Sequence, residues 1–350
     1  MSNLRVQQLQ HPSATTPALA LANDGAASAQ LSAINGGPLA GFRNAIINGN
    51  FDVWQRGTTF STSDFAADRW LNAYVGSSAV MSRQSFTPGQ TDVPGEPRFF
   101  NRAVVTSVAG PNNYSILLQR IEGVRTFAGQ TVTISFWAKA NASRSIAVEL
   151  AQWFGTGGSP SVMVSAIGAT KVAIGTAWQQ ISVTVTVPSI SGKTLGTNGD
   201  DYLALNIWFD GGSGFNARNG TLGQQSGTVD IARVQLEPGG FRTPFELRPL
   251  GAEVSLCKRY GQWVPFNMLF YASVAGQYLE TSLSWAEMRK TPVANTLVAD
   301  PNTVQANYNN ASNSIGRMTP YGGSCILQAT TGALSCYVTG YRSWLDAELT

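Results

Sequence analysis

The chain has 350 residues, of which 43% are hydrophobic and 12% are charged, and its net charge is +3. The length allows two or three domains, and the charged fraction is about half the roughly 25% of an average globular protein. The sequence has no run of Lys and Arg, which argues against a nucleic-acid groove, because such a groove needs clustered positive charge. The single histidine, His11, argues against histidine-based catalysis or metal sites.

The N-terminal sequence MSNLRVQQLQHPS lacks the apolar stretch of a signal peptide, and no segment of about 18 apolar residues follows it. We therefore expect no membrane insertion. Abundant glycine, serine, threonine and asparagine with few charges is typical of extracellular and virion proteins. Without a secretion signal, this composition indicates a protein made in the cytosol and released by other means, such as virus assembly followed by lysis.

Residues 1–43 are predicted to form an arm that precedes the main domains. The segment TTPALALANDGAASAQ predicts two short strands around a turn at Asn23 to Gly25. This segment is too small to form a core of its own. The alternation in ALALA favours docking on a partner protein or on other copies of the chain over a disordered leader.

Residues 44–248 are predicted to form one β-sandwich, of the jelly-roll type. Four segments alternate apolar and polar residues with a period of two, and the loops between them are rich in Gly, Ser, Asn and Asp. The four segments are 131–140, 145–154, 178–188 and 202–210. Residues 249–350 predict a helical turn followed by short strands, which indicates a smaller C-terminal β-sandwich domain. The expected fold class is therefore all-β.

The alternation assigns each side chain of these strands to one of two faces. One face is aliphatic and is predicted to form the core. The opposite face carries Trp137, Glu149, Trp153, Tyr202, Asn206 and Trp208. Aromatic rings stack on the apolar face of a sugar, and amides and carboxylates bond its hydroxyls, so these six residues are candidates for glycan binding. The alternative is that this face packs on a neighbouring subunit, on the arm or on another domain, where Trp and Tyr are also favoured.

Several motifs together resemble a family of bacteriophage tail fibre and receptor-binding proteins. They are IINGNFDVWQRGTTF, DRW, QRIEG, VQLEPGGFRTPFELRP, LCKRYGQW, WAEMRKTPV and the closing LDAEL. The resemblance implies a virion protein of the phage tail, usually a homotrimer. It would dock to other tail or baseplate proteins through residues 1–43 and recognise host-surface polysaccharide or lipopolysaccharide.

The central domain also resembles the jelly-roll carbohydrate-binding modules, through AGQTVTISFWAKA and the later WQQISVTVTVP. In those modules a structural calcium often ties the first strand to the last. The matching positions here are Asn50, Asp52 and Asp230, which supply the oxygen ligands that calcium prefers. The resemblance also makes residues 44–60 the first strand and first loop of the sandwich, with Phe51 and Val53 facing the core.

The favoured function is therefore non-catalytic recognition of host glycan by a tail fibre. One alternative is a purely structural virion component of the neck, baseplate or head. A polysaccharide depolymerase is less favoured, because such enzymes are often longer β-helices with sequence repeats, and this chain has none. Further aromatic candidates in the C-terminal domain, most of them expected to be packing residues, are Trp263, Tyr271, Tyr278, Trp285, Tyr308, Tyr321 and Tyr341.

Overall fold

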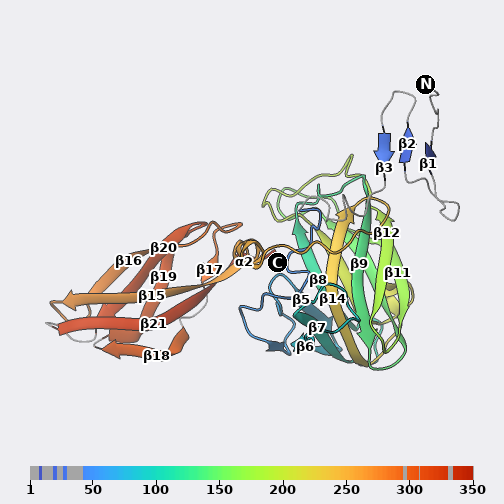
Figure 1. The fold of residues 1–350 in the computed structure, drawn as a ribbon. Coiled ribbons are helices and arrows are strands. Elements are labelled where there is room, and N and C mark those ends of the chain that lie inside the picture. The colour runs from blue at the N-terminus through green and yellow to red at the C-terminus, as the bar shows by residue number, and fades with distance from the viewer. Residues whose placement is uncertain are drawn as a thin grey trace, which may run out of the picture.

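The structure is a computed structural model that describes residues 42–294, 298–306, 308–329 and 334–349, together with three short N-terminal strands. Figure 1 shows a small N-terminal sheet, a central sandwich and a C-terminal group of strands, with α2 (Leu250–Lys258) between the last two. The other helical elements, η1 (Ser213–Phe215) and α1 (Asn216–Asn219), are a single turn each. The predicted all-β class is confirmed. None of the helices in the described part is long and apolar enough to cross a membrane.

The N-terminal sheet contains β1 (Gln8–Leu9), β2 (Leu19–Leu21) and β3 (Ala27–Ala29) in antiparallel order. Leu21 pairs with Ala27, so the predicted hairpin is confirmed. The turn predicted at Asn23 to Gly25 lies outside the described residues.

The sandwich consists of one five-stranded and one six-stranded antiparallel sheet. In spatial order the five-stranded sheet contains β11 (Val164–Ile174), β10 (Arg144–Trp153), β13 (Tyr202–Gly211), β8 (Tyr114–Glu122) and β5 (Leu71–Val75). The six-stranded sheet contains β12 (Gln179–Thr186), β9 (Thr131–Ala140), β14 (Gly227–Pro238), β7 (Phe99–Thr106), β6 (Ser78–Ser85) and β4 (Thr59–Phe60). The four strands predicted from alternation are β9, β10, β12 and β13, so these predictions are confirmed.

The aliphatic faces of the two sheets meet to form the main core. Ile134 and Phe136 of β9 contribute from the six-stranded sheet, and Val148 of β10 and Leu205 of β13 contribute from the other, all fully buried. The alternation of side chains along each strand therefore specifies the core, because every second residue of a strand points to the same side of its sheet.

The stretch from Asn44 to Phe60 differs from the predicted first strand. Asn48 and Phe51 both have φ of 56°, in the left-handed region, so the chain turns here instead of running straight. The Asn48 side chain holds the turn, since its Nδ2 donates to the carbonyl of Val53 at 2.8 Å and its Oδ1 accepts from the Val53 amide at 2.9 Å. Phe51 is fully buried and Val53 is 5% exposed, as expected for core-facing residues.

The C-terminal unit begins with α2, a nine-residue helix where the sequence predicted a single turn. One of its sheets contains β15 (Gly261–Ala272), β21 (Leu334–Asp346) and β17 (Val293–Ala294), with β18 (Val298–Ala306) also paired to β21. The other contains β16 (Tyr278–Ser284), β20 (Gly322–Ala329) and β19 (Tyr308–Thr319). The C-terminal part is thus built from two antiparallel sheets, as the sequence predicted.

Candidate functional site

Trp208, one of the predicted glycan-binding residues, lies on the outer face of the five-stranded sheet but is only 1% exposed. The η1 and α1 turns cover it, and the ring of Phe215 lies 5.3 Å from the indole ring. Tyr114 and Leu222 belong to the same apolar cluster. Trp208 is therefore a packing residue beneath the covering turns, and a sugar cannot reach it.

Glu149 and Asn206 are also buried under α1, at 0% and 3% exposure. The carboxylate of Glu149 accepts hydrogen bonds from Nε of Arg218 at 2.9 Å, from Nδ2 of Asn206 at 3.1 Å and from the amide of Ala166 at 2.7 Å. Arg218 belongs to α1, so this ion pair fixes the helix to the sheet. With these partners the two polar groups stabilise the fold instead of meeting a ligand, which corrects their predicted role.

Trp153 and Tyr202 remain half-buried at the other end of the same sheet. They are directly opposite each other on β10 and β13, and their rings stack with centroids 6.2 Å apart. The guanidinium group of Arg120 lies 5.1 Å from the Tyr202 ring. Of the predicted aromatic face, this pair is the part that a sugar ring can still approach.

Trp137 lies on the opposite side of the sandwich from the other five predicted residues. Its strand, β9, belongs to the six-stranded sheet, whereas β10 and β13 belong to the five-stranded sheet. The expectation of a single shared face was therefore wrong for Trp137. Alternation shows which side of its own strand a residue occupies, but it does not show which sheet the strand joins.

Asp230, predicted as a calcium ligand, is held in an ion-pair cluster on the outer face of the six-stranded sheet. Nε and Nη2 of Arg102 donate to its two carboxylate oxygens at 2.7 and 2.8 Å. Nζ of Lys139 lies 3.9 Å from the same carboxylate. These two cations already neutralise Asp230, so its surroundings fit an ion pair and not a calcium site.

Asn50 and Asp52, the other two predicted ligands, form a separate pair in which Asn50 Nδ2 donates to Asp52 Oδ2 at 2.8 Å. Burial raises the pKa of Asp52, while the Asn50 bond and the charges of Arg98 and Arg233 oppose that rise. Within the described ranges, no three His, Cys, Asp or Glu residues are placed to share a metal ion. Asp230 is thus paired elsewhere, and a calcium ion at Asn50 and Asp52 stays a prediction.

The motifs that resemble tail fibres meet at a junction between the sandwich and the C-terminal unit. Glu348, from LDAEL, is 1% exposed and binds two arginines of the sandwich. Its partners are Arg56 of WQRG, at 3.1 Å, and Arg69 of DRW. The Arg69 guanidinium also lies 3.5 Å from the ring centroid of Tyr260, in LCKRYGQW. These segments lie far apart in the chain, and no local pattern in the sequence predicts that they form one network.

The surrounding residues reinforce this junction. Glu122, from QRIEG, pairs with Arg259 at 3.0 Å and accepts a bond from the Tyr260 hydroxyl at 2.9 Å. Trp263 Nε1 donates to the carbonyl of Gln55 at 2.8 Å, so β15 is bonded directly to the first loop of the sandwich. The motifs thus connect two parts of the fold, which gives the WQRG stretch a structural role.

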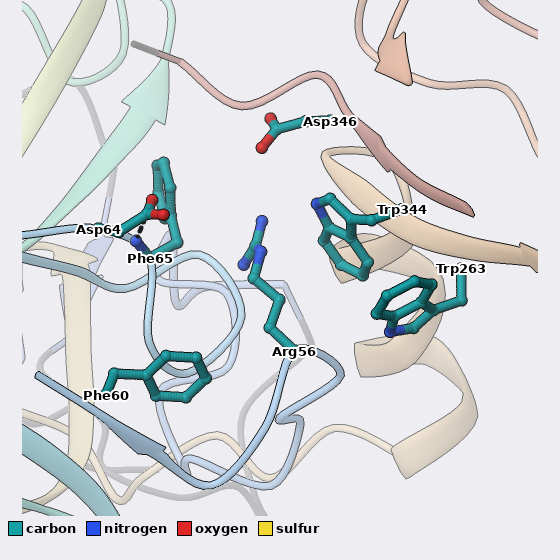
Figure 2. Close-up of a pocket in the computed structure, with 7 residues that line it drawn as sticks. All are labelled: Arg56, Phe60, Asp64, Phe65, Trp263, Trp344 and Asp346. Atoms are coloured by element: carbon teal, nitrogen blue, oxygen red, sulfur yellow. Dashed lines mark hydrogen bonds between the residues drawn. The ribbon is translucent and has the colours of Figure 1, made fainter. Parts of the chain in front are cut away.

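A cavity of about 250 Å³ lies beside the junction (Figure 2). Its lining residues are Arg56, Phe60, Asp64 and Phe65 from the sandwich and Trp263, Trp344 and Asp346 from the C-terminal unit. The guanidinium group of Arg56 lies between two rings, 5.1 Å from the Phe65 centroid and 4.3 Å from the Trp344 centroid. The indoles of Trp263 and Trp344 meet edge to face, 5.5 Å apart. The cavity wall is therefore largely aromatic, with charged groups between the rings.

The polar groups of this cavity are incompletely bonded. In the described part of the chain, Nη1 of Arg56 and Nε1 of Trp344 are buried donors without a hydrogen-bond partner. Asp64 Oδ1 accepts from the amide of Phe65 at 2.7 Å and Asp346 Oδ1 from that of Glu348 at 2.9 Å. Buried polar groups are nearly always bonded in folded proteins. Unpartnered donors beside carboxylates therefore suggest a place for a hydroxyl-bearing ligand or for water.

Trp263 is one of the predicted C-terminal aromatics, whereas Arg56 and Trp344 were not predicted as parts of one site. The available signal was the clustering of aromatic and charged residues inside the recognised motifs. It gave no indication that residues 56–65 and 344–346 meet in space.

No family model and no curated protein matches the chain. Among solved structures, a carbohydrate-binding module described as CBM4 is 18% identical with a TM-score of 0.30, over 55% of this chain and 98% of that one. The xylan-binding domain CBM22-2 from Paenibacillus barcinonensis is 13% identical with a TM-score of 0.30, over 52% and 98%.

A third similar structure is the enzymatically active domain of tailspike protein 4 from bacteriophage CBA120. It is 14% identical with a TM-score of 0.31, and the match covers 58% of this chain and 22% of that chain. Likenesses this weak do not place the chain in a family.

Proposed function

We propose that this chain is a non-catalytic glycan-binding protein and that the cavity of Figure 2 is its binding site. The observation that carries the proposal is the combination in one cavity of four aromatic side chains, two unpartnered donors and two carboxylates. A sugar ring matches this combination, because its apolar face stacks on aromatic rings and its hydroxyls donate and accept hydrogen bonds.

The size of the cavity supports a small ligand. Its volume of about 250 Å³ is near the lower limit of the roughly 300–1,000 Å³ typical of small-molecule sites. It is suited to one sugar unit at the end of a chain or to a side branch. The half-buried pair Trp153 and Tyr202 provides a second, flatter platform for a neighbouring unit.

We further propose that the protein belongs to a phage particle, as a homotrimeric tail fibre that docks to tail or baseplate proteins through residues 1–43. The short N-terminal sheet, together with the motifs shared with tail fibres, supports this role. Its target would be host polysaccharide or lipopolysaccharide. Three linked copies would raise the avidity of a weak sugar site without any new contact. The competing proposal, a purely structural virion component, requires no ligand in the cavity.

A glycosidase is the second candidate function, because Asp64 and Asp346 both line the cavity and glycosidases use two carboxyl groups. One feature counts against it. Asp64 is exposed to solvent, whereas the general acid of a glycosidase is normally held in an apolar environment. Incubation with bacterial polysaccharides separates the two functions, since an enzyme would release new reducing ends and a binding protein would not.

The test is binding of the full-length chain, with its mass in solution measured, to an array of bacterial capsular and lipopolysaccharide glycans. The double variant Asp64→Asn, Asp346→Asn removes both carboxylates while keeping their size. We expect it to lose at least about tenfold in affinity, through the lost charge-assisted hydrogen bonds. The control is Asp92→Asn, an exposed aspartate outside the cavity, which should bind normally.

Two results would contradict the proposal. Unchanged binding by the double variant would move the site away from this cavity, and loss of binding in Trp153→Ala, Tyr202→Ala would then place it on the stacked pair. Failure of a folded oligomer to bind any glycan would favour the purely structural component.

A further inference from the structure

A second cavity, of about 360 Å³, lies on the other side of the sandwich at the outer face of the six-stranded sheet. Trp137 of β9 and Gln180 of β12 line it, together with Arg233 in β14. Pro94, Gly95, Arg242, Pro244 and Phe245 complete the wall. This cavity shares no lining residue with the one in Figure 2, so the two are independent sites.

Arg233 is the unusual residue of this cavity. It lies at an irregularity in the pairing of β14 with β9, with φ of 51°, and the residue is 8% exposed. Its Nη2 donates to the carbonyl of Gly95 at 2.7 Å. Its Nε is buried and has no partner among the residues that the structure describes. The backbone thus holds a largely buried guanidinium group in the cavity wall with part of its bonding capacity unused.

The charge of Arg233 lacks a directly bonded counter-ion. No carboxylate lies within ion-pair distance of it in the described part of the chain. Burial lowers its pKa, and the charge of Asp52 raises it only in part. Arg242, a second cation, also lines the cavity, and the lining includes no acidic residue. An arginine is always charged near neutral pH, so the cavity is a positive site that the charge of Asp52 offsets only in part.

Aromatic surface lies next to these cations. The Arg233 guanidinium is 5.2 Å from the centroid of the Phe245 ring, which orients it. Trp137 is half-buried, so part of its indole remains available. Gln180 is exposed beside it and adds an amide that can donate and accept hydrogen bonds. An aromatic ring, a polar amide and two guanidinium groups therefore surround one space.

We propose that this cavity binds an acidic sugar, a ring that carries a carboxylate, with the carboxylate at Arg233 and Arg242 and the ring on Trp137. The planar fork of arginine matches a carboxylate in a bidentate arrangement. The choice of a sugar as the ring that carries the carboxylate rests on the proposed function, whereas the preference for an anion rests on the cavity alone. The chain would thus recognise a charged surface polysaccharide through two separate sites.

The test is calorimetric titration of the full chain with an oligouronate and with the same oligomer after reduction of its carboxyl groups to alcohols. The wild-type protein should bind the acidic form at least tenfold more tightly. Arg242→Gln and Trp137→Ala should each weaken that binding about tenfold. The matched control is Arg125→Gln, which removes the same charge from an exposed position outside the cavity and should leave binding unchanged.

Three outcomes would overturn the proposal: no binding of the oligouronate, equal binding of the reduced oligomer, or an equal loss in Arg125→Gln. The variant Asp64→Asn, Asp346→Asn separates the two sites. If it keeps uronate binding while losing neutral glycans, both sites stand. If it loses uronate binding too, the acidic sugar binds at the junction and the second site is refuted.

Discussion

The two outer faces of the sandwich use the same residue types in opposite ways. On the five-stranded sheet, Trp208 lies 5.1 Å from the guanidinium of Arg218, and Arg218 is bonded to the buried carboxylate of Glu149. On the six-stranded sheet, Trp137 and Arg233 line one cavity, and Arg233 has no carboxylate within ion-pair distance in the described part of the chain. The region around Trp208, the closed face, is covered by its own chain, whereas the region around Trp137, the open face, leaves a cation for a ligand to bind.

The bonding of a buried arginine distinguishes a packing surface from a binding surface more clearly than the aromatic residues do. When a buried charge is paired and hydrogen-bonded, its partners offset the free-energy cost of desolvation. Such a charge can hold an element in place. A buried charged group with an unpartnered donor is stabilised when a ligand accepts a hydrogen bond from that donor. Tryptophan occurs in both settings, so the bonding of the neighbouring arginine is the more informative feature.

The largest expected effect is on the closed face. Trp208→Ala would remove a fully buried indole and leave a cavity beneath the covering turns. It should lower the free energy of unfolding by about 3–5 kcal/mol. The matched change on the open face is Trp137→Ala. Loss of this half-buried indole should lower the free energy of unfolding by about 1 kcal/mol or less. Denaturant titrations of the two variants measure the contrast, and equal losses would show that both tryptophans are packing residues.

The next effect concerns the charges. Arg218→Gln would leave the Glu149 carboxylate buried with only its bonds to Asn206 and the Ala166 amide. Removing one partner of a buried ion pair typically costs 3–5 kcal/mol, and the partial exposure of Arg218 places the expected loss at about 3 kcal/mol. Denaturant unfolding would measure it, with Glu287→Gln, an exposed and distant charge change, as the control. A loss below about 1 kcal/mol would mean that α1 is not anchored by this pair.

The corresponding change on the open face is Arg233→Gln, and here we expect little loss of stability. The substitution gives up the bond to Gly95 but also removes a buried cation that lacks a bonded counter-ion. These terms oppose each other, so the unfolding free energy should stay within about 1 kcal/mol of the wild type. Binding of oligouronate should nevertheless disappear. A loss as large as that of Arg218→Gln would show that Arg233 is a structural residue.

Much of the fold could be predicted from the sequence, because alternation along a strand is a local property. Phe136 and Leu205 lie on the aliphatic side of the alternating strands, which was predicted to form the core, and both are fully buried. The turn at Asn48 was not foreseen, since its left-handed backbone is fixed by bonds from its side chain to Val53. No periodic pattern carries that information.

The site was less predictable because it depends on which strands become neighbours. Trp137 and Trp153 both lie on the side of their strand opposite the aliphatic residues, but their strands belong to different sheets. Arg56 and Glu348 are 292 positions apart and still form an ion pair. Both relations come from the topology. The sequence motifs that contain Arg56 and Glu348 drew attention to these residues, but their contact is visible only in the structure.

The smallest expected effect comes from Asp52, the acidic residue whose charge acts on Arg233. Burial raises its pKa above the ordinary value of 3.8, so the folded state holds this proton more tightly than the unfolded state. Ionisation of Asp52 therefore lowers the free energy of unfolding as the pH rises from about the ordinary aspartate pKa through the raised pKa, and acidification restores it. Asp52→Asn should remove that slope, which denaturant titrations between pH 3 and 7 can measure.

Asp52→Asn should also change ligand binding on the open face. Without the Asp52 charge, the potential at Arg233 becomes more positive, and oligouronate should bind a few-fold more tightly at neutral pH. Asp92→Asn, which makes the same charge change at an exposed position, controls for net charge. If Asp52→Asn weakened binding, the carboxylate would be holding Arg233 in its binding position. The open face would then depend on a paired charge as the closed face does.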